Sequence, residues 1–196
     1  LGIGETAFVM GSIGTVGERK NQVAMLDVLG PLLQRGIDAV LVLIGDVMLS
    51  ERHRALLADA RFSGRIVMPG QRSDAIRLLS AFDLYLCTSR VEEGPIATFE
   101  AMAARLPVLT SDVGHSNQLI ETGVNGGVFP IGSTAGMAEM AERYARDPEA
   151  RRAAGEAARR AIVQELAPAG IMPRIDAVYQ RAMARAHDRY RGRMQK

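Results

Sequence analysis

Apolar runs of strand length alternate with segments of helical periodicity along this chain. The strand-like runs occupy residues 8–13, 39–44, 65–68, 84–87, 106–110 and 127–129. The helical patterns occupy residues 21–35, 50–60, 74–81, 117–121, 134–146 and 148–165, the last of which opens on a proline. Nearly continuous apolar strands separated by helices are typical of a parallel sheet covered on both faces. We therefore predict an α/β fold with about six parallel strands.

Composition and charge narrow the class of protein. The chain has 196 residues, of which 47% are hydrophobic and 23% charged, as in a globular protein with one good core. We expect one domain over residues 1–171 and a basic helical tail over 172–196. No apolar run approaches the roughly 18 residues of a membrane span and no leader pattern opens the chain, so we expect a cytoplasmic location. The single cysteine, Cys87, lies in an apolar run and is expected to fill the core.

Two carboxylates, Glu92 and Glu100, are separated by eight positions across a turn at Gly94 and Pro95. Glu92 lies in the loop after a predicted strand, and Glu100 lies about two turns into the next helix, so both can face one crevice. Carboxylates accept hydrogen bonds from hydroxyls, and N–H groups at a helix start bind phosphates, which together suit a sugar nucleotide. The alternative is that both carboxylates belong to a solvated surface.

A glycine-rich loop, residues 11–21, joins the first predicted strand to the first helix. Its small residues let the backbone approach a phosphate, and Arg19 and Lys20 bring positive charge to the same place. A tight turn beside two solvated cations is the alternative interpretation of this loop.

The segment from Glu92 to Val108 resembles the signature of retaining glycosyltransferases of family four. That signature has a Glu, seven residues, a second Glu, Ala-Met-Ala and then Pro-Val, which match Glu92, Glu100, 101–103 and 107–108. The resemblance extends to about residue 165. It implies a single Rossmann-like domain, equivalent to the C-terminal, donor-binding half of a two-domain enzyme. Arg105 replaces a glycine usual in the family, which costs about 1 kcal/mol if the backbone there has a positive φ.

The same resemblance assigns roles to individual residues. The family's phosphate-binding arginine is replaced here by Thr15, and Arg19 is a candidate to supply the missing guanidinium beside Lys20. Lys20 and Arg19 would stabilise the departing diphosphate, Glu92 the transferred sugar, and Glu100 the ribose hydroxyls. The expected catalytic residues are Glu92, Lys20 and Arg19, and the expected donor-binding residues are Glu100, Gly14, Thr15, Gly94, Pro95, Ile96, Ala97 and, near the base, Gly70.

The implied reaction moves a sugar from a nucleoside diphosphate to an acceptor hydroxyl with retention, in glycan or glycolipid biosynthesis. We expect no cofactor and no metal, because the chain has no Asp-x-Asp and no His/Cys cluster with ligand spacing. A glycan or lipid-linked acceptor would bind an N-terminal domain that this chain lacks, so we expect the chain alone to be inactive. A non-catalytic nucleotide-sugar scaffold and an epimerase- or phosphorylase-type relative of the same fold are the alternatives.

The tail combines basic and apolar residues, and the sequence does not select a single binding partner for it. A net charge of only +2 gives little support to nucleic-acid binding. In the resembling family the final helix crosses back onto the N-terminal domain. Without that domain, a solvated helix, a homodimer of the isolated domain, and peripheral contact with anionic lipid at the inner face of the membrane are the alternatives for the tail. Its basic residues are Arg181, Arg185, Arg189, Arg191, Arg193 and Lys196, and its apolar stripe comprises Ile175, Val178, Tyr179, Ala182 and Met183.

Overall fold

The structure is a computed structural model that describes residues 1–194, with side chains described through residue 187. The side chains of Arg189, Arg191 and Arg193, and all of Lys196, which belong to the predicted basic tail, lie outside this described part.

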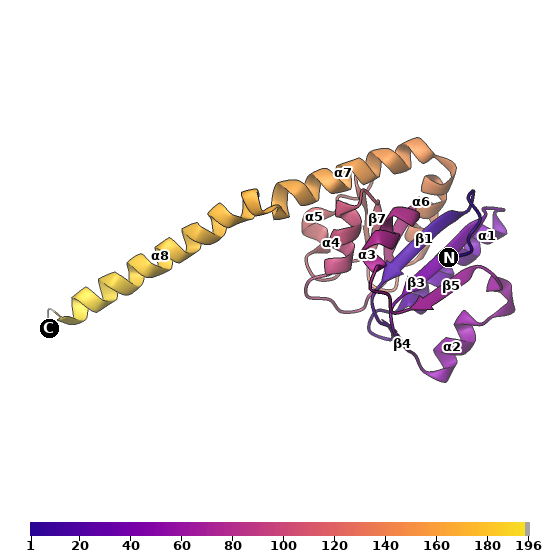
Figure 1. Cartoon of the computed structure of the whole chain (residues 1–196), viewed down its shortest axis with the longest axis horizontal. Coiled ribbons are helices and arrows are strands. Elements are labelled where there is room, and N and C mark those ends of the chain that lie inside the picture. The colour runs from indigo at the N-terminus through magenta and orange to yellow at the C-terminus, as the bar shows by residue number, and fades with distance from the viewer. Residues whose placement is uncertain (195–196) are drawn as a thin grey trace.

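A six-stranded parallel sheet forms the centre of the domain, as the alternating pattern predicts (Figure 1). The strand order is β5-β3-β1-β6-β7-β8, so the chain builds one half of the sheet outward from β1 and the other half outward from β6. This doubly wound arrangement is Rossmann-like. The strands are β1 (Phe8–Ile13), β3 (Ala39–Ile44), β5 (Ile66–Gly70), β6 (Leu84–Cys87), β7 (Val108–Ser111) and β8 (Gly126–Phe129).

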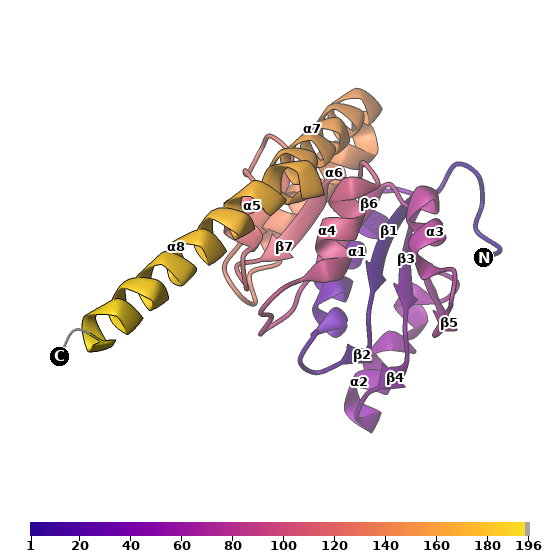
Figure 2. The same ribbon diagram turned by 60° about the vertical axis from the view of Figure 1, so that its left-hand side comes forward.

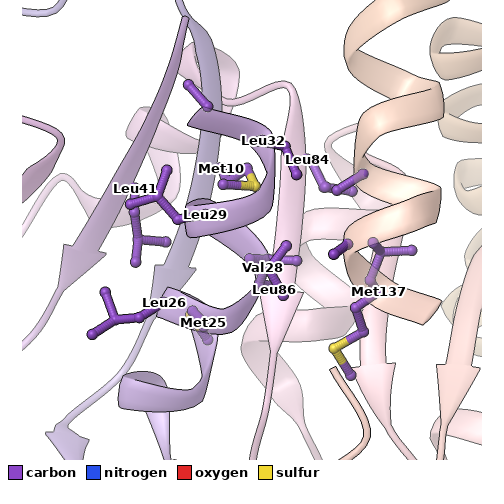
Figure 3. Packing of buried hydrophobic residues seen from close by; sticks show 14 of the residues in the cluster. Met10, Met25, Leu26, Val28, Leu29, Leu32, Leu41, Leu84, Leu86 and Met137 are labelled. Atoms are coloured by element: carbon purple, nitrogen blue, oxygen red, sulfur yellow. The ribbon is translucent and has the colours of Figure 1, made fainter. Parts of the chain in front are cut away.

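Helices cover both faces of the sheet because alternate strand residues point to opposite sides. Met10, Leu41 and Leu84 pack with one set of helices, whereas Val9 and Val42 pack with the other. Figure 3 shows the first of these layers around the helix that follows β1. The first layer contains α1 (Leu26–Gln34) and α6 (Ala135–Arg146), and the second contains α3 (Ala75–Leu78), η3 (Leu79–Ala81), α4 (Ile96–Ala103) and α7 (Pro148–Leu166). The remaining short helices are η1 (Gln22–Met25), α2 (Glu51–Leu57), η2 (Ala60–Phe62) and α5 (Ser116–Leu119).

A small second sheet, which the sequence pattern did not predict, joins the loops after β1 and β3. Here β2 (Val16–Gly17) pairs in parallel with β4 (Val47–Met48). Gly45 allows this approach: its φ is 146°, and a Cβ at this position would lie 2.2 Å from the Gly14 carbonyl oxygen. Two-residue strands carry too little periodicity to be recognised in a sequence, yet this pair holds the glycine-rich loop in place (Figure 2).

Two junctions in the second half of the chain follow the sequence expectations. Pro148 opens α7, and the Asp147 side chain caps the helix by accepting hydrogen bonds from the backbone N–H groups of Glu149 and Ala150. Arg105 follows the cap of α4 with a φ of 64°, so the condition under which the sequence predicted backbone strain is met. Its guanidinium Nε lies 2.9 Å from Glu156 Oε1 on α7.

The last helix, α8 (Pro168–Met194), leaves the body of the domain and extends away from it in both views (Figures 1 and 2). It begins four residues before the boundary at 172 expected from the sequence, because Pro168 again opens a helix. Within residues 1–194 no helix combines the length and hydrophobicity needed to cross a bilayer.

Candidate functional site

The strand order reverses between β1 and β6, and the candidate site lies where these two strands end. In doubly wound sheets, ligands bind outside the carboxyl ends of the strands at such a switch point. The loop after β1 carries Lys20, and the loop after β6 carries Glu92. The two loops also touch through the backbone, since the Arg90 N–H donates to the Arg19 carbonyl at 2.9 Å.

Lys20 and Glu92 form an ion pair across the switch point. The Lys20 Nζ lies 2.8 Å from Glu92 Oε1, and the same oxygen accepts from the Ser89 hydroxyl at 2.9 Å. The Glu92 side chain is only 7% exposed and the Lys20 side chain 22%. The two residues singled out from separate motifs are therefore in direct contact.

The surroundings of Glu92 favour its ionised form. Burial by itself raises the pKa of this carboxyl, but the hydrogen bonds from Lys20 and Ser89 and the charges of Lys20 and Arg19 outweigh burial, so the pKa lies below its ordinary value. Glu92 is therefore a carboxylate at neutral pH. It is suited to accept hydrogen bonds or to stabilise positive charge.

Arg19 lies at the exposed rim of this contact. Its Nη1 is 3.4 Å from Glu92 Oε2 and donates to the Val91 carbonyl at 3.3 Å, while its side chain is 61% exposed. Arg19 is the more exposed of the two cations, so it has the greater freedom to turn toward a ligand. Both cations converge on Glu92, an arrangement that the sequence motifs considered separately did not indicate.

Three polar residues that the sequence analysis missed shape the loops. Gln22 is buried, accepts from the Gly17 N–H and donates to the Thr15 carbonyl, each at 3.0 Å. Thr88 donates to the Asn21 carbonyl at 2.9 Å, and Ser89 orients Glu92 as described above. The sequence signal for Gln22 was a polar residue next to a glycine-rich turn, but its burial and its partners depend on the fold.

The start of α4 faces the same crevice. The Ile96 N–H donates to the Gly94 carbonyl at 2.8 Å, so this group is already engaged, and its binding of a phosphate stays a prediction. The Ala97 N–H has no hydrogen-bond acceptor in the described part of the chain. Pro95 and Ala97, together with Lys20, line a small cavity of about 10 Å³, which is room for one water molecule.

Glu100 lies one turn further along α4, half-buried and uncommitted. Its carboxylate has no hydrogen-bond or ion-pair partner among the residues with described side chains. Burial raises the pKa of the Tyr85 hydroxyl, and the charges of Cys87 and Glu100 add to this effect. The Tyr85 hydroxyl also bonds to both backbone groups of Ile13, at the end of β1. The charge of Glu100 is therefore felt at Tyr85, whose hydroxyl lies at the end of β1.

A larger cavity of about 290 Å³ continues from the glycine-rich loop toward β3 and β5. Gly14 and Thr15 line it on one side, and Gln71 and Arg72 on the other. Gly70 does not line this cavity, but its carbonyl accepts from the N–H of Gly45, which does, at 3.0 Å. The predicted phosphate loop and the predicted base loop thus border one continuous space.

Among the described residues, no group of three or more His, Cys, Asp or Glu side chains is placed to hold a metal ion. Cys87 is buried and its thiol lies 3.5 Å from the Ser89 hydroxyl.

Comparison with known proteins gives a family match over most of the chain. The model of the family described as glycosyl transferases group 1 matches residues 1–161. The chain is 28% identical over 143 residues to N-acetyl-alpha-D-glucosaminyl L-malate synthase of Bacillus anthracis, covering 73% of this chain and 38% of that protein. It is 30% identical over 141 residues to alpha-D-kanosaminyltransferase of Streptomyces kanamyceticus, covering 71% and 36%. The chain thus spans less than half the length of these relatives.

Solved structures agree with the fold. HepE of Anabaena, crystallised with UDP, superposes with a TM-score of 0.80 at 23% identity, over 89% of this chain and 49% of that one. WaaG, a glycosyltransferase involved in lipopolysaccharide biosynthesis, superposes with a TM-score of 0.74 at 26% identity, over 85% and 46%. The domain corresponds to the C-terminal half of such two-domain structures.

Proposed function

We propose that this chain, which belongs to the glycosyl transferases group 1 family, binds the nucleoside diphosphate sugar from which a retaining enzyme transfers the sugar to an acceptor hydroxyl. The observation that carries the proposal is the Lys20–Glu92 ion pair at the switch point, with the uncommitted Glu100 on the adjoining helix. Cations suited to a diphosphate and carboxylates suited to two sets of hydroxyls come from the loops after β1 and β6 and from the helix that follows β6.

The diphosphate is expected to change the partner of Lys20. A diphosphate carries more negative charge than a single carboxylate, and its oxygens form strong charge-assisted bonds with an ammonium group. Lys20 would then leave Glu92 and, with the exposed Arg19 and the free Ala97 N–H, bind the phosphates. The same exchange releases Glu92 to accept hydrogen bonds from hydroxyls of the sugar.

Glu100 is proposed to bind the ribose. A half-buried carboxylate without a protein partner can accept from two neighbouring hydroxyls without first breaking an internal bond. The nucleoside would then extend from Glu100 toward the cavity bordered by Gly14, Thr15 and the loop after Gly70. The turn at Gly94 and Pro95 sets the start of α4 against the diphosphate.

In the proposed transfer, the bond between the sugar's anomeric carbon and the diphosphate oxygen breaks, and its electron pair leaves with the diphosphate. Lys20 and Arg19 stabilise this developing negative charge. The acceptor oxygen forms the new bond to the anomeric carbon, and its proton passes to the leaving phosphate. Glu92 stabilises the transient positive charge at the sugar. Since the chain spans less than half of its relatives, the acceptor site and the complete activity are proposed for the whole enzyme.

The proposal is tested by calorimetric binding of UDP, GDP and ADP and their sugar conjugates. We expect one of the nucleotides to bind. Lys20→Met should lower the affinity for its diphosphate, and Glu100→Gln should lower the affinity for every ligand that carries the ribose. Loss of one charge-assisted bond corresponds to about 1.5–3 kcal/mol, or roughly 10- to 150-fold in Kd. Glu139→Gln removes a carboxylate from the exposed side of α6 and is the matched control.

Binding of a nucleotide with unchanged affinity in Lys20→Met and Glu100→Gln would refute the assigned site. Detection of an epimerised nucleotide sugar would instead indicate an epimerase-type relative, and phosphate-dependent cleavage of a glycan would indicate a phosphorylase-type relative of the same fold. Donor binding without transfer in the presence of the N-terminal domain would identify a scaffold.

A further inference from the structure

We propose that Thr98, in the first turn of α4, is a positioning residue for the diphosphate and acts through one water molecule held beside Lys20. The inference rests on the proposed donor site and adds to it a residue that no sequence motif and no ion pair identified. It begins from a hydroxyl that the fold buries without giving it a protein partner.

The hydroxyl of Thr98 has no partner although the residue is only 1% exposed. The backbone N–H of Thr98 donates to the Pro95 carbonyl at 2.9 Å, but its Oγ1 makes no hydrogen bond to any residue with a described side chain. Burying a hydroxyl without a partner destabilises a fold, and valine has the same shape without this cost. The hydroxyl therefore adds nothing to the stability of the free domain through protein contacts, which points to a ligand.

The small cavity beside Lys20 reaches this hydroxyl. Its volume of about 10 Å³ is room for one water molecule, and a buried water needs about two to four polar partners. The hydroxyls of Tyr85, Thr88 and Ser89 also line the cavity, but each is already engaged in the hydrogen bonds described above. Thr98 and the ammonium group of Lys20, which has donors beyond its ion pair, both retain the capacity to bind a water.

The start of α4 is suited to bring a phosphate oxygen to the mouth of this cavity. Pro95 occupies the N-cap without a side-chain hydrogen bond, and the Ala97 N–H is free in the described part of the chain. The N-terminal end of this eight-residue helix also carries a partial positive charge. Ala97 and Lys20 both line the cavity, so a phosphate bound to the two would lie against the water.

The direction of the hydrogen bonds follows from the charge of the phosphate. An ionised phosphate oxygen only accepts, so the water donates to it and accepts in turn from the Thr98 hydroxyl. A hydrogen bond through an ordered water is nearly as favourable in enthalpy as a direct one. Lys20 would thus supply charge, whereas Thr98 would fix the position of the diphosphate relative to α4.

The test is ligand-observed NMR titration of UDP, GDP and ADP, and of uridine, guanosine and adenosine, into the wild type and two variants. Thr98→Val should lower the affinity for the diphosphate that binds about three- to tenfold, as expected for the loss of one hydrogen bond, and leave the affinity for its nucleoside unchanged. Thr98→Ser keeps a hydroxyl and should restore the affinity. Thr134→Val is the matched control, because Thr134 lies partly buried before α6, beyond β8 at the edge of the sheet, and its side chain makes no cap hydrogen bond.

Urea unfolding separates this role from a structural one. Thr98→Val should be at least as stable as the wild type, because its hydroxyl has no protein partner to lose. A structural role would instead lower the stability and reduce the affinities for the diphosphate and the nucleoside together, and this result would overturn the inference. A crystal structure of the diphosphate complex should show one water between Thr98 Oγ1 and a phosphate oxygen, and its absence there would also overturn the inference.

Lys20→Met, measured in the same titrations, keeps a failure of this inference separate from a failure of the donor site. A diphosphate that Lys20→Met weakens and Thr98→Val does not would overturn the role of Thr98 alone. If no diphosphate binds, or if Lys20→Met leaves its affinity unchanged, the proposed donor site fails and the role of Thr98 fails with it.

Discussion

Neutralising Glu92 should strengthen the binding of a nucleoside diphosphate, although Glu92 lies inside the proposed site. In the free domain its carboxylate occupies the ammonium group that the diphosphate needs, at a distance of 2.8 Å. The variant Glu92→Gln removes this competition. Its amide oxygen can still accept from Ser89, which keeps the side chain in place.

The magnitude follows from the burial of the pair. Fully exposed ion pairs contribute about 0.2–1 kcal/mol, whereas breaking a fully buried pair costs about 3–5 kcal/mol. Glu92 is nearly buried and Lys20 is 22% exposed, so we place the interaction near the lower end of this interval, at about 1–2 kcal/mol. A diphosphate that no longer displaces Glu92 should therefore bind about 5- to 30-fold more tightly.

The sugar conjugate should gain less than the nucleotide alone, because Glu92 is also proposed to bind the sugar. The measurement is calorimetric titration of both ligands into the wild type and Glu92→Gln. Glu93→Gln is the control, since Glu93 is an exposed neighbour with the same charge and no ion-pair partner among the described side chains. Unchanged or weaker diphosphate binding in Glu92→Gln would refute the reasoning. An equal gain in Glu93→Gln would assign the effect to general charge rather than to the ion pair.

Three further predictions concern the stability of the domain. Arg105→Gly should relieve about 1 kcal/mol of backbone strain and lose an exposed ion pair with Glu156 that contributes less than that. Urea unfolding should therefore show that Arg105→Gly is at least as stable as the wild type. Arg105→Ala, which keeps the strain and loses the ion pair, should be less stable than Arg105→Gly. Gln22→Leu should cost about 1–3 kcal/mol in the same assay and weaken nucleotide binding, because two backbone groups of the glycine-rich loop lose their partner; wild-type stability would contradict this. Because the pKa of Glu92 is lowered in the folded domain, its ionised carboxylate contributes fully to stability above the ordinary carboxyl pKa, and this contribution is lost as the pH falls through the lowered pKa. The difference in free energy of unfolding between the wild type and Glu92→Gln should therefore shrink in acid. A difference that grows in acid would refute this sign.

The sheet could be predicted closely because its signal is local. Three strands, Phe8–Ile13, Ala39–Ile44 and Leu84–Cys87, have the predicted bounds, since each is a mainly apolar run that is followed by a polar residue or glycine. The strand after Arg105 begins two residues later than predicted, at Val108, because Pro107 has no N–H to donate to a neighbouring strand. The observed helix bounds differ from the predicted ones where a cap or a short turn decides at which residue the helix begins or ends.

The candidate site was predicted in its residues but not in its contacts. Lys20, Arg19 and Glu92 were each identified from a motif, yet their mutual pairing depends on the order β1-β6 in the sheet, which sets two loops about 70 positions apart in sequence side by side. Ser89 and Gln22 are ordinary polar residues in the sequence. They gain their roles only because the fold buries them beside groups that need a partner.

The amino-acid sequence by itself determined the alternation of strands and helices and the residue types of the site, because each depends on neighbours a few positions away. Only the tertiary structure decided that Glu92 holds Lys20, that Glu100 has no partner and that the Ile96 N–H is already engaged. It also decided that the apolar stripe of α8 lies outside the core. The physical reason is that ion pairing, burial and exposure are set by which distant segments the sheet brings together, and a local pattern carries no information about that.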